Sequence, residues 1–271
     1  LEIEELYRAP GQKHPVIPGS SIKGALRTAL LNSRVEAIDK TAPGAFDGFR
    51  NSRDRFDSKF QREVLGFTKP NDDPFRMIRV GDCPIDPRGT QLVGQLFQYK
   101  PFRRDGVCFD STALYAEVIR GLMTGSEQSA EFEIQQGDTV ASAVVPPHSK
   151  ALRDREGQPL FQKKVTVQEI LEAADSHYYR YWFYKEYNKF YNEAEDSAIR
   201  NAADKLADLV DELHDKGNYL VRIGRWSHIE SVTVKGLASP RGRHGYGKTR
   251  TLLEYEGSYL PMGWCSLEVV R

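Results

Sequence analysis

The chain has 271 residues, enough for one large domain or two modest ones. Its 38 basic and 38 acidic residues give a net charge of zero, so any surface for a polyanion must be a local basic patch. Three widely separated cysteines argue against a disulfide framework and a zinc site. With no signal peptide and no apolar run long enough to span a bilayer, we expect a cytoplasmic protein without a membrane partner.

The first recognisable element lies near the start of the sequence. Residues 17–30 read IPGSSIKGALRTAL, and the apolar residues that follow the Pro-Gly pair recur at helical spacing. The pattern predicts a helix over residues 20–32. Ser20 or Ser21 can cap this helix by accepting a hydrogen bond from a first-turn amide.

Two cations of the same segment indicate a binding site. Lys23 and Arg27 lie four residues apart and can reach one partner together. Free amides at the positive end of a helix, combined with these cations, would bind an anion, most simply a phosphate of a nucleic acid or nucleotide. The alternative is a capped amphipathic helix with two solvated cations, and the pattern alone leaves both open.

The rest of the chain alternates between helices and strands, which predicts an α+β fold. Residues 42–66 indicate a helical insertion, and strands are expected within residues 76–98 and at residues 130–135. Residues 166–216 read as helical. Further strands are expected at residues 219–223, 229–234 and 264–270.

The predicted helices of residues 166–216 have marked features. Thr166 and Glu169 fit a capping box. An amphipathic helix from Ile199 to Leu213 ends at Gly217. Aromatic residues crowd all faces of residues 177–191, which favours packing against a core or a neighbouring subunit over stacking on bases.

A glycine-rich basic loop spans residues 235–250. Its glycines permit close backbone approach to a ligand, and Arg241, Arg243, Lys248 and Arg250 supply charge. The alternative is a surface loop whose cations are merely solvated. Residues 242–249 match the P-loop pattern, but no long helix and no aspartate follow, so we reject an ATPase or GTPase.

The stretch PGSSIKGALRTA resembles the signature of the RAMP superfamily of CRISPR proteins, most of all the guide-end-capping subunits of type III-A (Csm) effector complexes. Weaker similarities lie in the turn of residues 79–84, in residues 117–121 and in residues 221–224. In the last of these, the residues that follow depart from the second glycine of the family loop.

The resemblance implies a fold and a domain layout. We expect a ferredoxin-like (RRM-like) RAMP core within a single domain over residues 1–271. The core would comprise residues 1–35, 76–150 and 218–271, and helical elaborations would occupy residues 40–75 and 165–217.

The resemblance also implies a function: a non-catalytic subunit that binds crRNA, caps the filament at the 3′ end of the guide and supports crRNA maturation and antiviral defence. Its partners would be crRNA, other Csm-type RAMP subunits and target RNA, with no cofactor and no metal. Ser20, Ser21, Lys23 and Arg27 would form one RNA-binding patch, and Arg241, Arg243, Lys248 and Arg250 the second.

Two other functions stay open within the family. A metal-independent RAMP endoribonuclease that processes CRISPR repeat RNA would need a general base and acid, and His228 and His244 form the most suitable pair. The chain could also be another backbone subunit of a type III complex.

Overall fold

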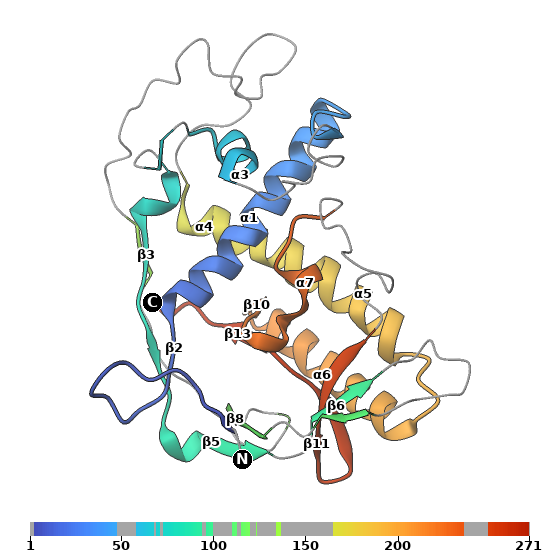
Figure 1. The fold of residues 1–271 in the computed structure, drawn as a ribbon. Helices are drawn as coiled ribbons and strands as arrows, with labels where there is room; N and C mark the ends of the chain where they lie inside the picture. The colour runs from blue at the N-terminus through green and yellow to red at the C-terminus, as the bar shows by residue number, and fades with distance from the viewer. Residues whose placement is uncertain are drawn as a thin grey trace.

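The computed structural model describes residues 3–47, 58–67, 69–70, 73–93, 96–99, 110–112, 115–119, 123, 134–136, 165–235 and 249–270. Helices and short strands mix in these residues, so the α+β prediction is confirmed. Figure 1 shows the long helix α1 against α4, with strands arranged around the helices. No helix of the described residues is long and apolar enough to cross a bilayer.

Helix α1 extends well beyond its predicted end at residue 32, because it spans Gly19–Thr41. Val35 and Ile38 continue its buried stripe. Arg34, directly before Val35, is also buried, and its guanidinium NH2 pairs with Glu169 Oε1 of α4 at 2.8 Å. A charged residue at a core-facing position interrupted the apolar pattern without ending the helix.

A second helical run faces α1 and alternates between two kinds of helix. It consists of α4 (Val167–Ala174), the π-helical η5 (Asp175–Phe183), α5 (Tyr184–Glu186) and the π-helical η6 (Tyr187–Tyr191). The predicted N-terminal cap is confirmed, because Thr166 Oγ1 accepts the Glu169 N–H at 3.1 Å.

Helix α6 (Ser197–Asp215) confirms the predicted amphipathic helix. Its apolar face is buried through Ile199, Leu206 and Val210. Gly217 adopts a φ of 87°, a left-handed conformation that ends the helix at low cost. The helix α3 (Ser58–Leu65) lies within the predicted helical insertion.

The strands form five small sheets, with orders β1-β8-β5, β10-β13, β12-β11-β6-β7, β2-β4 and β3-β9. Only β1 with β8 is a parallel pair among the described strands. The ferredoxin-like core stays a prediction. The strands are β1 (Ile3–Glu4), β2 (Val16–Ile17), β3 (Ile78–Val80), β4 (Cys83–Pro84), β5 (Thr90–Val93), β6 (Leu96–Tyr99), β7 (Asp110–Thr112), β8 (Tyr115–Ile119), β9 (Ile134–Gln136), β10 (Tyr219–Arg222), β11 (Arg250–Tyr255), β12 (Ser258–Pro261) and β13 (Trp264–Leu267).

The C-terminal part differs from prediction at two places. The strand expected at residues 229–234 is wrong, because α7 (His228–Ser231) occupies its start, after the 3₁₀ turn η7 (Arg225–Ser227). The buried Ser231 hydroxyl donates to the His228 carbonyl at 3.1 Å and satisfies a turn of this helix. The hairpin β11–β12 was not predicted, and it turns at Glu256 and Gly257 with φ of 48° and 76°.

The main hydrophobic core lies between α1, α3, the α4–η5 run and β10. Phe46 and Phe60 meet edge to face there, with ring centroids 5.5 Å apart. The short 3₁₀ turns η2 (Pro74–Met77) and η3 (Pro87–Gly89) each begin with an aspartate that accepts a backbone N–H. This core fixes the start of α1 against the segment of residues 73–82.

Candidate nucleic-acid interface

The first turn of α1 is held by the turn between β3 and β4. Asp82 Oδ1 accepts the Gly19 N–H at 2.8 Å, so a carboxylate of the protein already lies at the positive end of the helix. The N-cap is Pro18, and no side chain caps the helix, so the expected capping by Ser20 or Ser21 is wrong. Both serines are exposed instead.

Gly19 is required by close packing. A Cβ at this position would lie 2.1 Å from the Val80 carbonyl oxygen and 2.6 Å from that of Gly81. These are backbone atoms that cannot move aside without shifting the turn. The glycine of the motif therefore allows α1 to begin directly against β3.

Lys23 and Arg27 do not bind one partner together in the structure, because each contacts a different group within the protein. Lys23 Nζ donates to the Ile78 carbonyl oxygen at 2.6 Å, and partial burial lowers the pKa of Lys23. Arg27 NH1 pairs with Asp73 Oδ2 at 2.8 Å, and its Nε donates to Gln61 Oε1 at 2.9 Å. A phosphate would have to compete with these oxygens.

The glycine-rich loop lies largely outside the described residues, and so do Arg241, Arg243 and Lys248. The first residue of the loop, Lys235, is described, and α1 holds it in place. The buried Asn32 of α1 accepts the Lys235 N–H at 2.8 Å through Oδ1 and donates to the Thr233 carbonyl oxygen at 3.2 Å through Nδ2. The side-chain amide of Asn32 thus holds the first residue of the loop against α1.

The prediction that Arg250 contacts RNA needs correction. Its side chain is 3% exposed, and its Nε donates to Glu186 Oε2 at 2.8 Å, while the guanidinium carbon lies 3.8 Å from the centroid of the Phe190 ring. A guanidinium buried against a carboxylate and a ring cannot reach a phosphate. Arg250 instead joins the hairpin β11–β12 to the helical run.

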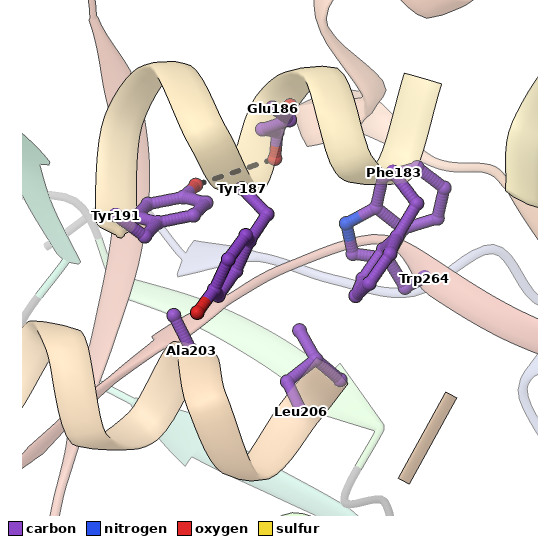
Figure 2. A pocket seen from close by; sticks show the side chains of 7 residues that line it. All are labelled: Phe183, Glu186, Tyr187, Tyr191, Ala203, Leu206 and Trp264. Carbon is purple, nitrogen blue, oxygen red and sulfur yellow. Dashed lines mark hydrogen bonds between the residues drawn. The ribbon is translucent and has the colours of Figure 1, made fainter. Parts of the chain in front are cut away.

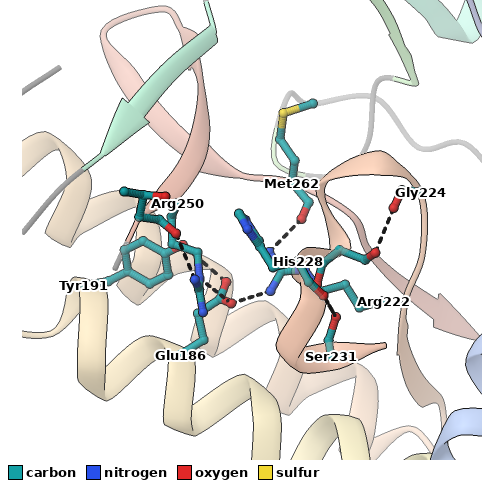
Figure 3. A network of polar contacts seen from close by, with 10 residues as sticks. Glu186, Tyr191, Arg222, Gly224, His228, Ser231, Arg250 and Met262 are labelled. Atoms are coloured by element: carbon teal, nitrogen blue, oxygen red, sulfur yellow. Dashed lines mark hydrogen bonds and ion pairs between the residues drawn. The ribbon is translucent and has the colours of Figure 1, made fainter. Parts of the chain in front are cut away.

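Arg250 belongs to a buried ionic cluster that the sequence analysis missed. Figure 3 shows Arg222 and Arg250 pointing at Glu186, with Tyr191 beside the same carboxylate. The Tyr191 hydroxyl donates to Glu186 Oε1 at 3.2 Å. Burial alone would raise the pKa of Glu186, but Arg222 and Arg250 outweigh it and lower that pKa to about 2.

His228 lies beside this cluster, at the end of the loop that begins at Gly224 (Figure 3). Burial, reinforced by Arg222 and Arg250, lowers the pKa of His228 to about 3. Such an imidazole carries no proton near neutral pH and is poorly suited to act as a general acid. His244, its suggested catalytic partner, lies outside the described residues.

The aromatic run packs mainly into the interior, as the analysis favoured. Tyr178, Trp182, Phe183, Phe190 and Tyr191 are all buried. Figure 2 shows a cavity between this run and α6, and it is only about 10 Å³, room for one water molecule. The lining residues are Phe183, Glu186, Tyr187, Tyr191, Ala203, Leu206 and Trp264.

In the part of the chain that the structure describes, no group of three or more His, Cys, Asp or Glu side chains could hold a metal ion. Cys83 is buried and Cys265 is partly buried, both as free thiols. Burial raises the pKa of the Cys265 thiol to about 11, which makes it a poor nucleophile.

Comparison with known protein families decides the family. The model of the RAMP superfamily matches residues 4–228, which include the start of α1, the run α4–η6 and α6. The chain belongs to the RAMP superfamily. The glycine-rich loop begins just beyond the matched residues. No curated protein sequence matches the chain.

Two solved structures share the fold of this RAMP protein. One is a chain of a Csm–crRNA–target RNA ternary complex from a type III-A CRISPR–Cas system, with a TM-score of 0.62 and 20% sequence identity over 97% of this chain and 74% of that one. The other is Csm5 from T. onnurineus, with a TM-score of 0.58 and 19% identity over 97% of this chain and 73% of that one.

Several residues that shape the RAMP motif escaped the sequence analysis. Asp82 lies in the turn of residues 79–84, which the family resemblance had already marked. Asp73 precedes a proline, the usual setting of an aspartate that caps a short helix, and this signal could have revealed it. Asn32 and Glu186 carried no local signal, because their partners are distant in sequence.

Proposed function

We propose that this RAMP protein is a non-catalytic, crRNA-binding subunit of a type III-A (Csm) effector complex that caps the filament at the 3′ end of the guide. The observation that carries the proposal is the fold likeness, which extends over 97% of this chain both for a chain of a Csm–crRNA–target RNA complex and for Csm5. The likeness extends over nearly the whole of this chain at 19–20% identity, and it supports a subunit of this kind.

In this proposal the guide backbone lies along the exposed Ser20 and Ser21 at the start of α1, and Arg241, Arg243 and Lys248 contribute further phosphate contacts. Such contacts position RNA without reading its sequence. Lys23 and Arg27 hold the turn in place through Ile78 and Asp73, and bind phosphate only by giving up those partners. A ferredoxin-like core around α1 is part of the same proposal.

The proposed role extends to partners. Neighbouring Csm-type RAMP subunits would contact the chain along the filament, target RNA would pair with the bound guide, and crRNA maturation and antiviral defence would depend on the cap. The burial and low pKa of His228 weigh against the rival role of a repeat-cleaving RNase. Incubation of repeat RNA with the protein in EDTA tests that rival directly.

The first test is to purify the complex from its host through a tag on this chain and to sequence the bound RNA. Repeat-derived guides of set length are the expected result, and the complete absence of small RNA would contradict the proposal. A copy number of one per complex is expected for a cap, whereas several copies would indicate a backbone subunit.

A sharper variant for the same test is Ser20→Glu/Ser21→Glu. Negative charge in the first turn favours the helix but repels phosphate, so folding is retained while the guide is weakened or its 3′ ends become ragged. Ser197→Glu, at the exposed first-turn serine of α6, is the matched control and should leave the guides as in the wild type. Lys23→Ala/Arg27→Ala is compared with both, and its thermal unfolding shows whether lost RNA reflects a lost fold.

A further inference from the structure

Two lysines converge on one partly exposed tyrosine ring of the helical run. Lys235 Nζ lies 4.1 Å from the centroid of the Tyr181 ring, and Lys185 Nζ lies 4.9 Å from the same centroid. Lys185 Nζ also donates to the Tyr181 hydroxyl at 2.8 Å and lies 4.8 Å from the Trp182 ring centroid. Both lysines are exposed, so this cation–aromatic patch faces solvent.

The patch carries positive charge that no carboxylate of the described residues neutralises. Among the described residues, neither Lys185 nor Lys235 forms an ion pair with a carboxylate. The ring attracts each ammonium through its electron-rich face, but it does not cancel their mutual repulsion. Two like charges held together over one ring favour an anion between them.

The position of the patch adds a second argument. Lys235 is the first residue of the glycine-rich loop, and its N–H is fixed by Asn32 of α1. The patch therefore adjoins the start of a loop whose cations enter the proposed guide-binding surface. Three other tyrosines of the helical run, Tyr179, Tyr184 and Tyr187, are also partly exposed. Their hydroxyls donate to aspartates of α6, whereas the Tyr181 hydroxyl accepts from Lys185, and this sets Tyr181 apart.

We propose that Tyr181, Lys185 and Lys235 form a binding site for one nucleotide of single-stranded RNA. The two ammonium groups contact its phosphate, and the base stacks on the Tyr181 ring. The site rests on the proposed RNA-binding function and extends it to a surface formed by η5, α5 and the residue that opens the loop.

RNA fits this patch better than an acidic protein segment does. A carboxylate would pair with the lysines but has no flat surface that could stack on the ring. A nucleotide offers both a phosphate and a flat base, and base stacking on an aromatic side chain tolerates any sequence. A cap that holds guides of different sequence requires such tolerance.

The test measures binding of fluorescein-labelled oligoadenylate, and of the same oligonucleotide with abasic positions, to the full chain by anisotropy. The wild type should prefer the oligoadenylate. Tyr181→Leu should weaken its binding about tenfold and abolish the preference, whereas Tyr181→Phe should retain both. Lys185→Ala/Lys235→Ala should weaken both ligands and make the logarithmic salt dependence shallower by about 0.7, the value for one phosphate contact.

The matched control for the lysines is Lys40→Ala/Lys216→Ala. It removes the same charge from exposed residues that pair with Glu36 and Glu212, and it should bind RNA as the wild type does. If the wild type binds RNA and the patch variants bind equally well, the nucleotide site is wrong while the proposed function stands. The same holds if those variants instead lose only assembly with other subunits. If the wild type neither binds RNA nor co-purifies with it, both proposals fail.

Discussion

Two carboxylates of this RAMP protein each lie near two cationic side chains, but they differ in their exposure to solvent. Asp73 lies near Lys23 and Arg27 at the start of α1, and its side chain is 17% exposed. Glu186 lies between Arg222 and Arg250, and its side chain is 3% exposed. The same chemistry therefore appears once beside solvent and once in the interior.

The difference teaches which cations can serve a ligand. A partly exposed arginine can exchange a carboxylate for a phosphate at modest cost, because water screens both states. A buried arginine cannot, because separating it from its partner leaves an uncompensated charge in the interior. The sequence analysis assigned both Arg27 and Arg250 to RNA contacts, and burial separates them.

The largest expected effect comes from breaking the interior group. Glu186→Gln leaves two buried guanidinium groups without a carboxylate, so the free energy of unfolding should fall by about 3–5 kcal/mol. Urea denaturation followed by circular dichroism measures it. Glu212→Gln, on the exposed face of α6, is the control and should leave the midpoint unchanged. An equal midpoint for both variants would contradict the assigned role of burial.

A smaller effect on stability is expected at the start of α1, from the two glycines of the motif. Gly19→Ala places a Cβ against the Val80 and Gly81 carbonyl oxygens and should cost about 1–3 kcal/mol. In the same helix, Gly24 has no atom within 4 Å of such a Cβ, so Gly24→Ala should stabilise the protein by about 0.5–1 kcal/mol. Thermal unfolding of the two variants should therefore shift in opposite directions.

The most gradual effect is a loss of stability in acid, which is spread over several pH units. Burial lowers the pKa of His177 to about 4, so the unfolded chain, with a histidine pKa of about 6.5, binds more protons in this interval. His228 acts in the same direction. Stability should fall from about pH 6.5 to pH 4. Below about pH 4.3 the loss should continue towards pH 2, as Glu186 becomes protonated in the unfolded chain.

Urea midpoints measured across this range check the prediction. His177→Gln removes one of the two histidine contributions, so its midpoint should vary less steeply with pH between 7 and 4 than that of the wild type. A profile that is flat in the wild type, or equally steep in the variant, would show that His177 is not held neutral by burial.

The elements that could be predicted from sequence are those whose signals are local. The cap at Thr166 and the helix α6 with its stop at Gly217 depend on residues a few positions apart. The length of α1 was underestimated, because Arg34 occupies an interior position with a partner in α4. The pairing of Arg34 with Glu169 spans 135 residues and leaves no trace in a short window.

The candidate site follows the same rule. Helical spacing places Lys23 and Arg27 one turn apart, but their separate partners Ile78 and Asp73 come from a distant segment that no pattern connects to α1. The hairpin β11–β12 carries a weak sequence signal, because it turns at Glu-Gly rather than at the more typical Asn-Gly. Arg250 was misassigned because its strand was not recognised.

The amide of Asn32 turns α1 into a spacer of fixed length. Ser20 and Asn32 are twelve residues apart, a rise of about 18 Å along a helix that hydrogen bonds keep from stretching. Because Asn32 holds Lys235, the point where the glycine-rich loop begins stands at that set distance from the exposed serines. A ligand that contacts both the serines and the start of the loop must therefore span this length of α1.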